Sequence, residues 1–278
     1  MKHAFARKQR PNHSLEILFS TLNVATSGYY DWLGRPTSKT TQDNSRIVTK
    51  IRGFYNASHS IYGAPQIHKD LIDDGENINR QRVARLMKMY GIQSKMAKKF
   101  VITTHSKYTL SPDPDLLKRC FRTKRMNQAW VTDKTFIRTR QGWVYLAMMH
   151  ELYSPKVIGW AMSDRNNTLL VCDALMMAYW RQGKIQEVIV HSDQGSTYSS
   201  NEYRKLLKEQ NMLCNMSRKG ECHDNAIAES FFSSLKTERV DDEDYFTRSE
   251  VKKSIFKYIK VLYNRQRRHS YFGYISRI

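Results

Sequence analysis

The hydrophobic positions in the first sixty residues recur mainly at helical spacing. Residues 14–33 form an apolar-rich stretch with Ser14 placed to cap its start, which predicts a helix. Residues 34–45 are polar and rich in turn formers, and they predict a linker. Apolar residues then return at helical spacing between Ile47 and Tyr55. The N-terminal part is therefore predicted to be helical, with one break.

Two short helices separated by a glycine-containing turn are predicted next. The first ends at Asp74 and Gly75, and the second starts near Asn79 and ends at Gly91. This order is the outline of a helix-turn-helix. The inward stripe of the second helix consists of Val83, Leu86, Met87 and Tyr90. The polar positions left on its outer side are Arg80, Gln81, Arg82 and Arg85.

Arg and Gln are side chains that hydrogen-bond base edges or phosphates when a helix enters the major groove. These four positions are therefore candidate DNA contacts. The alternative interpretation is an ordinary helical hairpin with a solvated basic face.

Strands replace helices after a basic, irregular stretch that ends near residue 128. Short apolar segments joined by turns predict an antiparallel meander over residues 129–137, 142–152 and 156–163. Strands and helices then alternate, with helices at 168–180, 201–210, 224–238 and 251–264 and strands at 187–192 and 212–217. Such an order predicts an α/β fold in which helices pack on a mixed sheet.

The charge of the chain adds a class of partner to this picture. The formal net charge is +20, and residues 1–125 carry 23 Lys and Arg against 9 Asp and Glu. Basic chains bind polyanions, so nucleic acid is the leading partner and an anionic membrane the alternative. The sequence holds no apolar run long enough to span a membrane and no N-terminal apolar segment. We therefore expect no membrane partner and a cytoplasmic location.

Three acidic residues stand where carboxylates are costly. Asp133 lies inside the first predicted strand, Asp193 ends the fourth, and Glu229 lies on a helix. Burying an unpaired carboxylate is unfavourable, and three brought together would repel one another. A divalent cation resolves this, because Mg²⁺ binds a few carboxylates together with water and phosphate oxygens. The alternative is that each acid is exposed at the end of its own element.

The spacing of these acids matches a known pattern. A long interval separates Asp133 from Asp193, and a shorter one separates Asp193 from Glu229. The segments "WVTDKTFI", "HSDQGSTYSS" and "DNAIAESFFSSLKTE" contain them, and "SGYYDWLGRP" and "SIYGAPQIHKDL" lie upstream. Together they resemble the OrfB-type transposases of the IS-three family of insertion sequences. That family shares the D, D, 35, E signature of retroviral integrases, whose last two acids are spaced as Asp193 and Glu229 are here.

The resemblance implies a ribonuclease H-like catalytic domain preceded by a helix-turn-helix segment. It implies a DDE transposase that cleaves and joins DNA at insertion-sequence ends, with Asp133, Asp193 and Glu229 holding two Mg²⁺ ions that Mn²⁺ could replace. Two alternatives remain at this point. One is an inactive DNA-binding relic or regulator that occupies element ends, and the other is a nuclease of the same fold that cleaves without joining.

The resemblance also implies partners and boundaries. The partners are double-stranded DNA at the element ends and the target, further copies of this chain on the DNA, and a first-frame OrfA-type protein that this chain does not contain. Such a protein is expected at the nucleoid. The expected divisions are an N-terminal helical segment at 1–35, a helix-turn-helix-like segment at 45–103, a linker at 104–128 and a catalytic core at 129–278.

Three further residues are placed near the acids by simple geometry, and a fourth is placed behind them. Lys236 is seven positions after Glu229, so on an α-helix it shares that face and could hold a DNA phosphate. Asn225 and His191 are candidate site neighbours, four positions before Glu229 and two before Asp193. Lys134 stands where relatives usually carry an apolar residue, and strand alternation predicts that it points away from the site. The alternatives are a solvated lysine and an Asn at a helix start.

Overall fold

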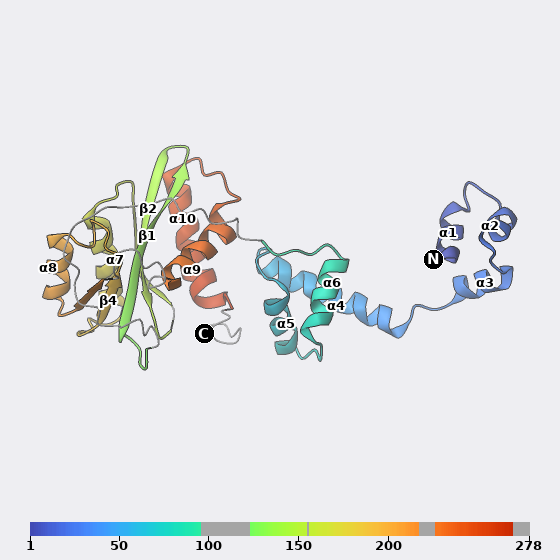
Figure 1. Cartoon of the computed structure of the whole chain (residues 1–278), viewed down its shortest axis with the longest axis horizontal. Coiled ribbons are helices and arrows are strands. Elements are labelled where there is room, and N and C mark those ends of the chain that lie inside the picture. The colour runs from blue at the N-terminus through green and yellow to red at the C-terminus, as the bar shows by residue number, and fades with distance from the viewer. Residues whose placement is uncertain (96–122, 155, 217–225, 269–278) are drawn as a thin grey trace.

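The computed structural model describes residues 1–95, 123–154, 156–216 and 226–268. Helices dominate the first part of the chain and a sheet with flanking helices the second (Figure 1). The N-terminal helices are α1 (Lys2–Gln9), α2 (Leu15–Leu22), α3 (Thr26–Gly34), α4 (Lys39–Ala57), α5 (Ala64–Asp73) and α6 (Arg80–Met89). The strands are β1 (Ala129–Thr139), β2 (Gly142–Glu151), β3 (Val157–Ser163), β4 (Ile189–Ser192) and β5 (Leu213–Met216). Their helices are α7 (Thr168–Arg181), α8 (Asn201–Glu209), α9 (Ala226–Leu235) and α10 (Arg248–Lys257), and π-helical segments η2 (Lys236–Val240) and η3 (Tyr258–Gln266) follow α9 and α10.

Two predictions for the N-terminal part are wrong in detail. The single helix over residues 14–33 is two helices, because Asn23 adopts the left-handed conformation with φ 48° and ends α2. The predicted linker at residues 34–45 is shorter, because α4 begins at Lys39 with Ser38 accepting a hydrogen bond from Thr41 N. The predicted cap at Ser14 is confirmed by its hydrogen bond from Ile17 N.

The helix-turn-helix outline is confirmed in helices α4, α5 and α6, which enclose a small core of their own. Asn79 caps α6, as predicted, by accepting a hydrogen bond from Arg82 N. Its buried stripe comprises Val83, Leu86 and Met87. Tyr90, which the pattern placed in this stripe, is 40% exposed because it follows the last helical turn.

The sheet has the strand order β3-β2-β1-β4-β5. Strands β1, β2 and β3 are antiparallel, as the meander pattern predicts, whereas β4 pairs in parallel with β1, and β5 in parallel with β4. The predicted mixed α/β sheet is therefore confirmed. Beyond Val131, the described pairing on the β4 side stops, so the outer half of β1 is bonded to β2 alone.

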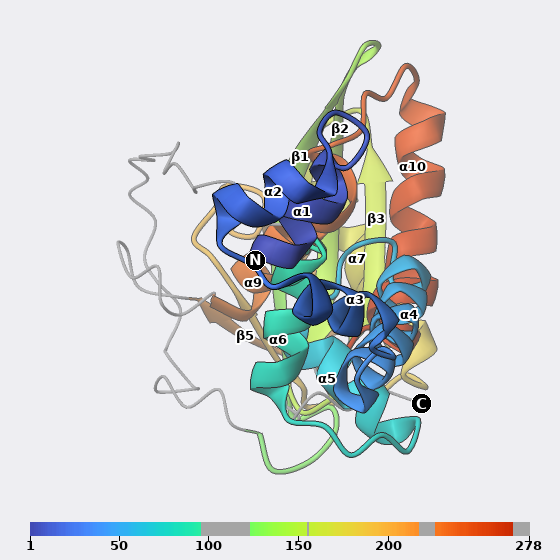
Figure 2. The ribbon, with the colours of Figure 1, turned by 90° about the vertical axis from the view of Figure 1, so that its right-hand side faces the viewer.

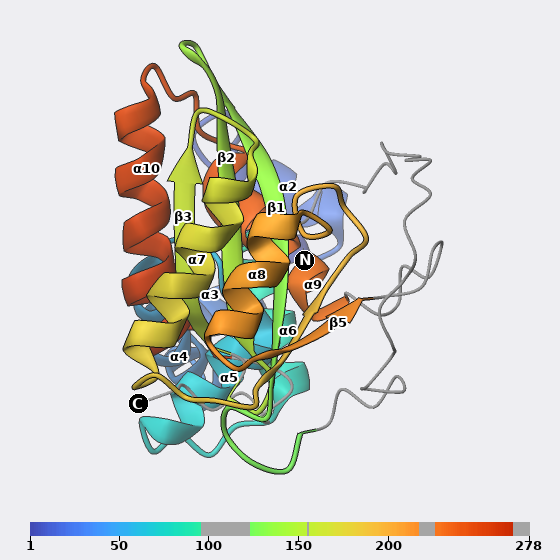
Figure 3. The same ribbon diagram turned by 90° about the vertical axis from the view of Figure 1, so that its left-hand side faces the viewer.

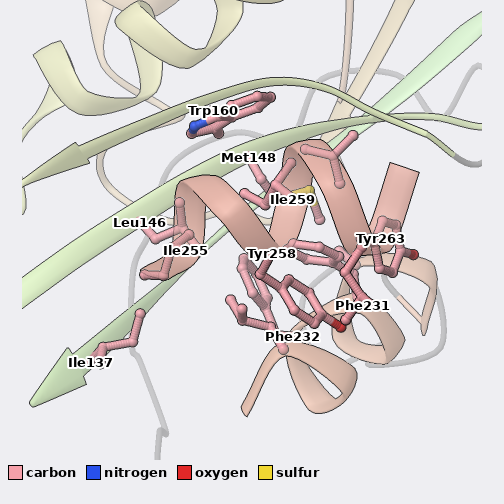
Figure 4. Close-up of a cluster of buried hydrophobic side chains, with 14 of the residues drawn as sticks. Ile137, Leu146, Met148, Trp160, Phe231, Phe232, Ile255, Tyr258, Ile259 and Tyr263 are labelled. Carbon is pink, nitrogen blue, oxygen red and sulfur yellow. The ribbon is translucent and has the colours of Figure 1, made fainter. Parts of the chain in front are cut away.

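Helices cover both faces of this sheet. Helices α7 and α8 cover one face, and α7 comes so close to β3 that a Cβ at Gly159 would lie 2.4 Å from Ala174 O (Figure 3). Helices α9 and α10 with η3 cover the other face. Figure 4 shows this second core, where Phe231 and Tyr263 pack edge to face with ring centroids 4.8 Å apart. Alternate residues of β1 therefore enter different cores, Trp130 with α7 and Val131 with α9.

The end of η3 joins the sheet half of the chain to α5. Arg268 Nε lies 2.7 Å from Asp70 Oδ1, and one of its terminal nitrogens lies 2.7 Å from Asp73 Oδ2. The Tyr62 hydroxyl donates to Gln266 O at 2.9 Å. Figure 2 looks along the molecule, with the N-terminal helices α1–α6 in front of the sheet. Ionic and hydrogen bonds thus hold the two regions together.

Candidate functional site

The parallel pairing of β1 with β4 brings two of the three acids to the same level. Val131 lies opposite His191 in the register. Continuing that register by two residues puts Asp193 opposite Asp133, and neighbouring strands lie only about 4.8 Å apart. Two carboxylates that are far apart in the sequence therefore meet where β4 ends.

Backbone amides orient both of these carboxylates. Asp133 Oδ1 accepts a hydrogen bond from Lys134 N at 2.7 Å, and Asp193 Oδ1 accepts one from Gly195 N at 3.0 Å. A Cβ at residue 195 would lie 2.9 Å from that Asp193 oxygen, so a larger residue there would displace the carboxylate. The turn after β4 is therefore built around the orientation of Asp193.

The third acid comes from the helix that covers this face of the sheet. The described part of α9 begins at Ala226, and Ala228, Phe231 and Phe232 pack it onto the core that Val131 enters. Strand alternation puts Asp133 on the same face as Val131. Glu229 lies on the exposed side of the first described turn of α9. Glu229 therefore lies on the same side of the sheet as Asp133.

The charges of the three acids are coupled. Burial, with added repulsion from Asp193 and Glu229, raises the pKa of Asp133 to about 7. This is the electrostatic condition that a divalent cation relieves, and carboxylate oxygens are the donors that Mg²⁺ and Mn²⁺ prefer. The donor chemistry therefore fits a hard metal ion. Among the described side chains, however, no group of three acids, histidines or cysteines is close enough to hold one.

Lys134 is a neighbour of the site that sequence reasoning missed. It lies on the opposite face of β1, as alternation predicts, but its chain is long enough to reach the turn after β4. Its Nζ bonds Thr197 Oγ1 and Asn166 Oδ1, each at 3.0 Å. Burial lowers the pKa of Lys134, while the charges of Asp193 and Asp133 oppose that shift. The positive charge of Lys134 therefore stabilises the carboxylates of Asp133 and Asp193 from the opposite face of β1.

The other predicted neighbours differ in their surroundings. His191 is buried in β4 and its Nδ1 lies 2.8 Å from Asn215 Nδ2 of β5, so it braces the sheet beneath Asp193. Lys236 is partly buried at the start of η2, with its Nζ 5.8 Å from the ring centroid of Phe136. Asn225 lies outside the described residues.

The four candidate DNA contacts of α6 are not equivalent. Arg80, Gln81 and Arg85 are exposed. Arg82 turns back onto α4, where one terminal nitrogen lies 2.6 Å from Asp43 Oδ2 and 2.7 Å from Asn44 Oδ1. Helical spacing correctly separates the inner and outer sides of α6, but it gives no sign of partners on another helix.

Comparison with known families assigns both halves of the chain. Residues 123–222 and 210–276 match the Integrase core domain, and residues 42–100 match the HTH-like domain. Across 99% of its length, the chain is 38% identical to Transposase InsF for insertion sequence IS3A of Escherichia coli strain K12, and the match spans 96% of that protein.

The chain belongs to the InsF family of IS3 transposases. It is also 37% identical, over 91% of its length, to the insertion element IS600 uncharacterized 31 kDa protein of Shigella sonnei, of which it covers 93%. Among solved structures, similarity extends to the catalytic domain of Mos1 mariner transposase. That match has 13% identity, a TM-score of 0.39, and coverage of 49% of this chain and 71% of that one.

Family membership confirms the predicted class and fold. The chain is a DDE transposase, a polynucleotidyl transferase with a ribonuclease H-like core behind an HTH-like domain. It acts on DNA, and divalent metal ions are the usual cofactor of this class. Catalytic inactivity, the alternative raised from the sequence, is not indicated by these relatives. No helix in the described part of the chain is both long and apolar enough to cross a membrane.

Proposed function

We propose that Asp133, Asp193 and Glu229 form the metal-binding catalytic site at which this transposase cleaves insertion-sequence ends and joins them to DNA. The observation that carries the proposal is the parallel pairing of β1 with β4, in which Val131 and His191, each two residues before one of the first two acids, lie opposite each other. The coupling of both charges to Glu229 supports the inclusion of the third acid.

Each residue has a definite task in this proposal. Bound Mg²⁺, as two ions, would supply the positive charge that activates the attacking oxygen and stabilises the leaving one. Asp133 and Asp193 would hold it with carboxylates that backbone amides already orient. Glu229 would complete the ligand set from α9. The same acids would serve hydrolysis, which releases a 3′-hydroxyl, and the subsequent attack of that hydroxyl on a second phosphodiester.

We propose two groups of DNA contacts around this site. Lys236 would hold a phosphate near Glu229, and Asn225 and His191 remain candidate neighbours of the acids. Arg80, Gln81 and Arg85 would contact the element end from the exposed side of α6. Arg82 is a weaker candidate for DNA, because Asp43 and Asn44 already engage its guanidinium.

The proposal extends to assembly and organisation. Joining two ends needs at least two DNA segments in one complex, so we propose a homo-oligomer on DNA, with an OrfA-type protein as a further partner at the nucleoid. We also propose that the functional units are 1–35, 45–103, a linker at 104–128 and 129–278. The separate cores of α4–α6 and of the sheet support the two larger units.

A strand-transfer assay tests the site. Wild-type protein, labelled element-end duplex and Mg²⁺ or Mn²⁺ should give cleaved and joined products, and a chelator should abolish both. Asp193→Asn should lose both products while binding duplex nearly as well as wild type, because it removes a metal ligand and no phosphate contact. Asp173→Asn, which removes an exposed carboxylate on α7, is the matched control and should remain active.

Joining at the wild-type rate by Asp193→Asn would overturn the assignment of the site. Cleavage without joining by the wild type would instead leave the site in place and favour the nuclease alternative.

A further inference from the structure

One end of the sheet carries two exposed aromatic rings that the proposed catalytic site does not use. Phe136 of β1 is 51% exposed and Trp143 of β2 is 43% exposed. Phe136 lies opposite Tyr145 and Trp143 opposite Arg138, so both rings stand on the same face of the β1–β2 hairpin. Figure 3 shows this hairpin extending beyond α7 and α8, the helices that cover the rest of that face.

The two rings form a fixed platform. Their centroids are 5.2 Å apart and their planes meet at 89°, the edge-to-face arrangement that aromatic pairs prefer. The register of β1 and β2 makes them diagonal neighbours, so the backbone of the hairpin holds them together. Exposed rings held in this way can accept a flat ligand without first being ordered.

Positive charge surrounds the platform. Lys236 Nζ lies 5.8 Å from the centroid of the Phe136 ring, and Arg138 is exposed on the same face. Two carboxylates near this end of the sheet are paired already: Asp164 with Arg248 at 3.5 Å and Asp244 with Arg140. The ligand that fits is therefore flat and attached to negative charge, which describes a nucleotide.

The platform is also close to the proposed chemistry. Phe136 is three residues after Asp133 on the same strand, or about 10 Å along it. The two side chains leave opposite faces of β1, but the pairing with β4 stops at Val131, so beyond that residue no strand among the described residues pairs with this edge of β1. Lys236, which follows α9 on the face of the acids, reaches the Phe136 ring around that edge. A nucleotide next to a phosphate held at Asp133 could follow the same path.

The form of the DNA follows from the use of ring faces. In a paired duplex the faces of the internal bases are stacked on one another and unavailable to a protein ring. An unpaired base has both faces free and is therefore the occupant that suits the platform best.

We propose that Phe136 and Trp143 bind, by stacking, an unpaired base at the DNA end beside the scissile phosphate, with Lys236 on the phosphate of that nucleotide. The proposal rests on the proposed function of the acidic site. A second copy of this chain is a poorer occupant, because two rings supply only a few hundred Å². A stable interface buries roughly 1,200 to 2,000 Å² in total.

The test compares two DNA ends on a protein that cannot cut them. Both ends carry the element sequence, but one has its terminal base pairs matched and the other mismatched. In the Asp193→Asn background, we expect the mismatched end to bind about tenfold more tightly, because its bases need no unpairing. Phe136→Ala and Trp143→Ala should each remove about tenfold in affinity for that end, or about 1.4 kcal/mol, and little for the matched end. Phe136→Tyr should retain the preference.

A matched control exists at the far end of α7. Trp180 is 58% exposed and Lys184 Nζ lies 4.3 Å from its ring centroid, so Trp180→Ala removes a similar aromatic and cation pair remote from the site. It should keep the preference for mismatched ends. As a second readout, 5-iodouracil placed at each terminal nucleotide should crosslink to Phe136 or Trp143 from one position.

If Phe136→Ala and Trp143→Ala prefer mismatched ends as strongly as Trp180→Ala does, the stacking site is overturned. A shift of Phe136→Ala or Trp143→Ala to a smaller oligomer in light scattering would overturn it too, and would assign the rings to contact between copies. Neither outcome affects the proposed function of the acidic site. That proposal fails by a different result, namely if Asp193→Asn still joins DNA.

Discussion

The carboxylates of the helix-turn-helix-like segment and those of the sheet are in opposite electrostatic conditions. Between α4 and the turn after α5, each acid has a basic partner. Lys50 Nζ lies 2.6 Å from both Asp74 and Glu76, and bonds from Arg46 and Lys50 lower the pKa of Glu76 to about 2. At the end of β4 the situation is reversed, because burial and neighbouring acids raise the pKa of Asp133 to about 7.

This contrast distinguishes acids that stabilise the fold from acids that we propose bind a metal ion. Paired carboxylates at the surface gain modestly from their partners. Carboxylates gathered without such pairing oppose folding, and their presence indicates a function in the reaction. Four predictions test whether the two groups differ in this sense.

Asp133→Asn should have the largest effect. Loss of this proposed metal ligand should remove several kcal/mol of transition-state stabilisation, so joining should fall by about a thousandfold. The same change should raise the melting temperature in chelator at pH 8, because the folded chain disfavours the ionised acid above its pKa of about 7. Activity assays and thermal melts measure the two effects. A lower melting temperature for Asp133→Asn than for wild type in chelator would show that ionised Asp133 does not destabilise the folded chain.

Arg268→Ala should give the next largest effect, on stability. Asp70 is half-buried and its pKa is raised by burial, an effect that Arg268 opposes from 2.7 Å. Removing the guanidinium leaves that carboxylate without its main cation, so the free energy of unfolding should fall by about 2 kcal/mol, between the values for exposed and buried pairs. Urea denaturation measures it. Arg265→Ala, at an exposed position in η3, is the control, and equal midpoints for the two variants would contradict the prediction.

The sequence predicted the strands better than it predicted the ends of the N-terminal helices. Short apolar segments joined by turns located β1, β2 and β3, whereas alternation of burial is seen in the outer part of β1 and the first residues of β2 and not in β3. The break at Asn23 depends on one residue in the left-handed conformation, which leaves no trace in a hydrophobic pattern. Similarly, the start of α4 at Lys39 was missed because its first turns are as polar as a linker.

The candidate site rests on a different kind of sequence signal. Asp133, Asp193 and Glu229 were proposed from their spacing and from resemblance to a family, and the pairing of β1 with β4 adds a physical argument for the first two. The reach of Lys134 and the pairing of Arg82 could not be predicted, because each depends on a partner that is distant in the sequence. Alternation and helical spacing assign a side chain to a face but give no partner on another element.

Arg82→Ala and Arg85→Ala should separate packing from DNA contact on one helix. Arg85 is exposed, so its loss should weaken end binding by about 1 kcal/mol and reduce the slope of log affinity against log salt by about one. Arg82 is held by Asp43, so its loss should lower the stability of the segment and change the salt slope little. Salt titrations of binding and thermal melts measure the two effects. Identical salt slopes in the two variants would remove the distinction.

The smallest effect should be the response of the paired acids to pH. Bonds from Arg46 and Lys50 hold the pKa of Glu76 at about 2, below its ordinary value of 4.5. The folded chain therefore binds fewer protons than the unfolded chain between these values. The stability that Glu76 contributes is fully present above pH 4.5 and is lost as the pH falls toward 2.

Wild type should be slightly more stable than Glu76→Gln at pH 6, and the gap in urea midpoint should close progressively toward pH 3. A gap that stays constant over this range would show that the carboxylate acts through its shape and hydrogen bonds, not its charge. Asp133 should respond in the opposite direction. The unfolded chain loses this proton near pH 4 and the folded chain near pH 7, so the metal-free chain loses stability as the pH rises between these values.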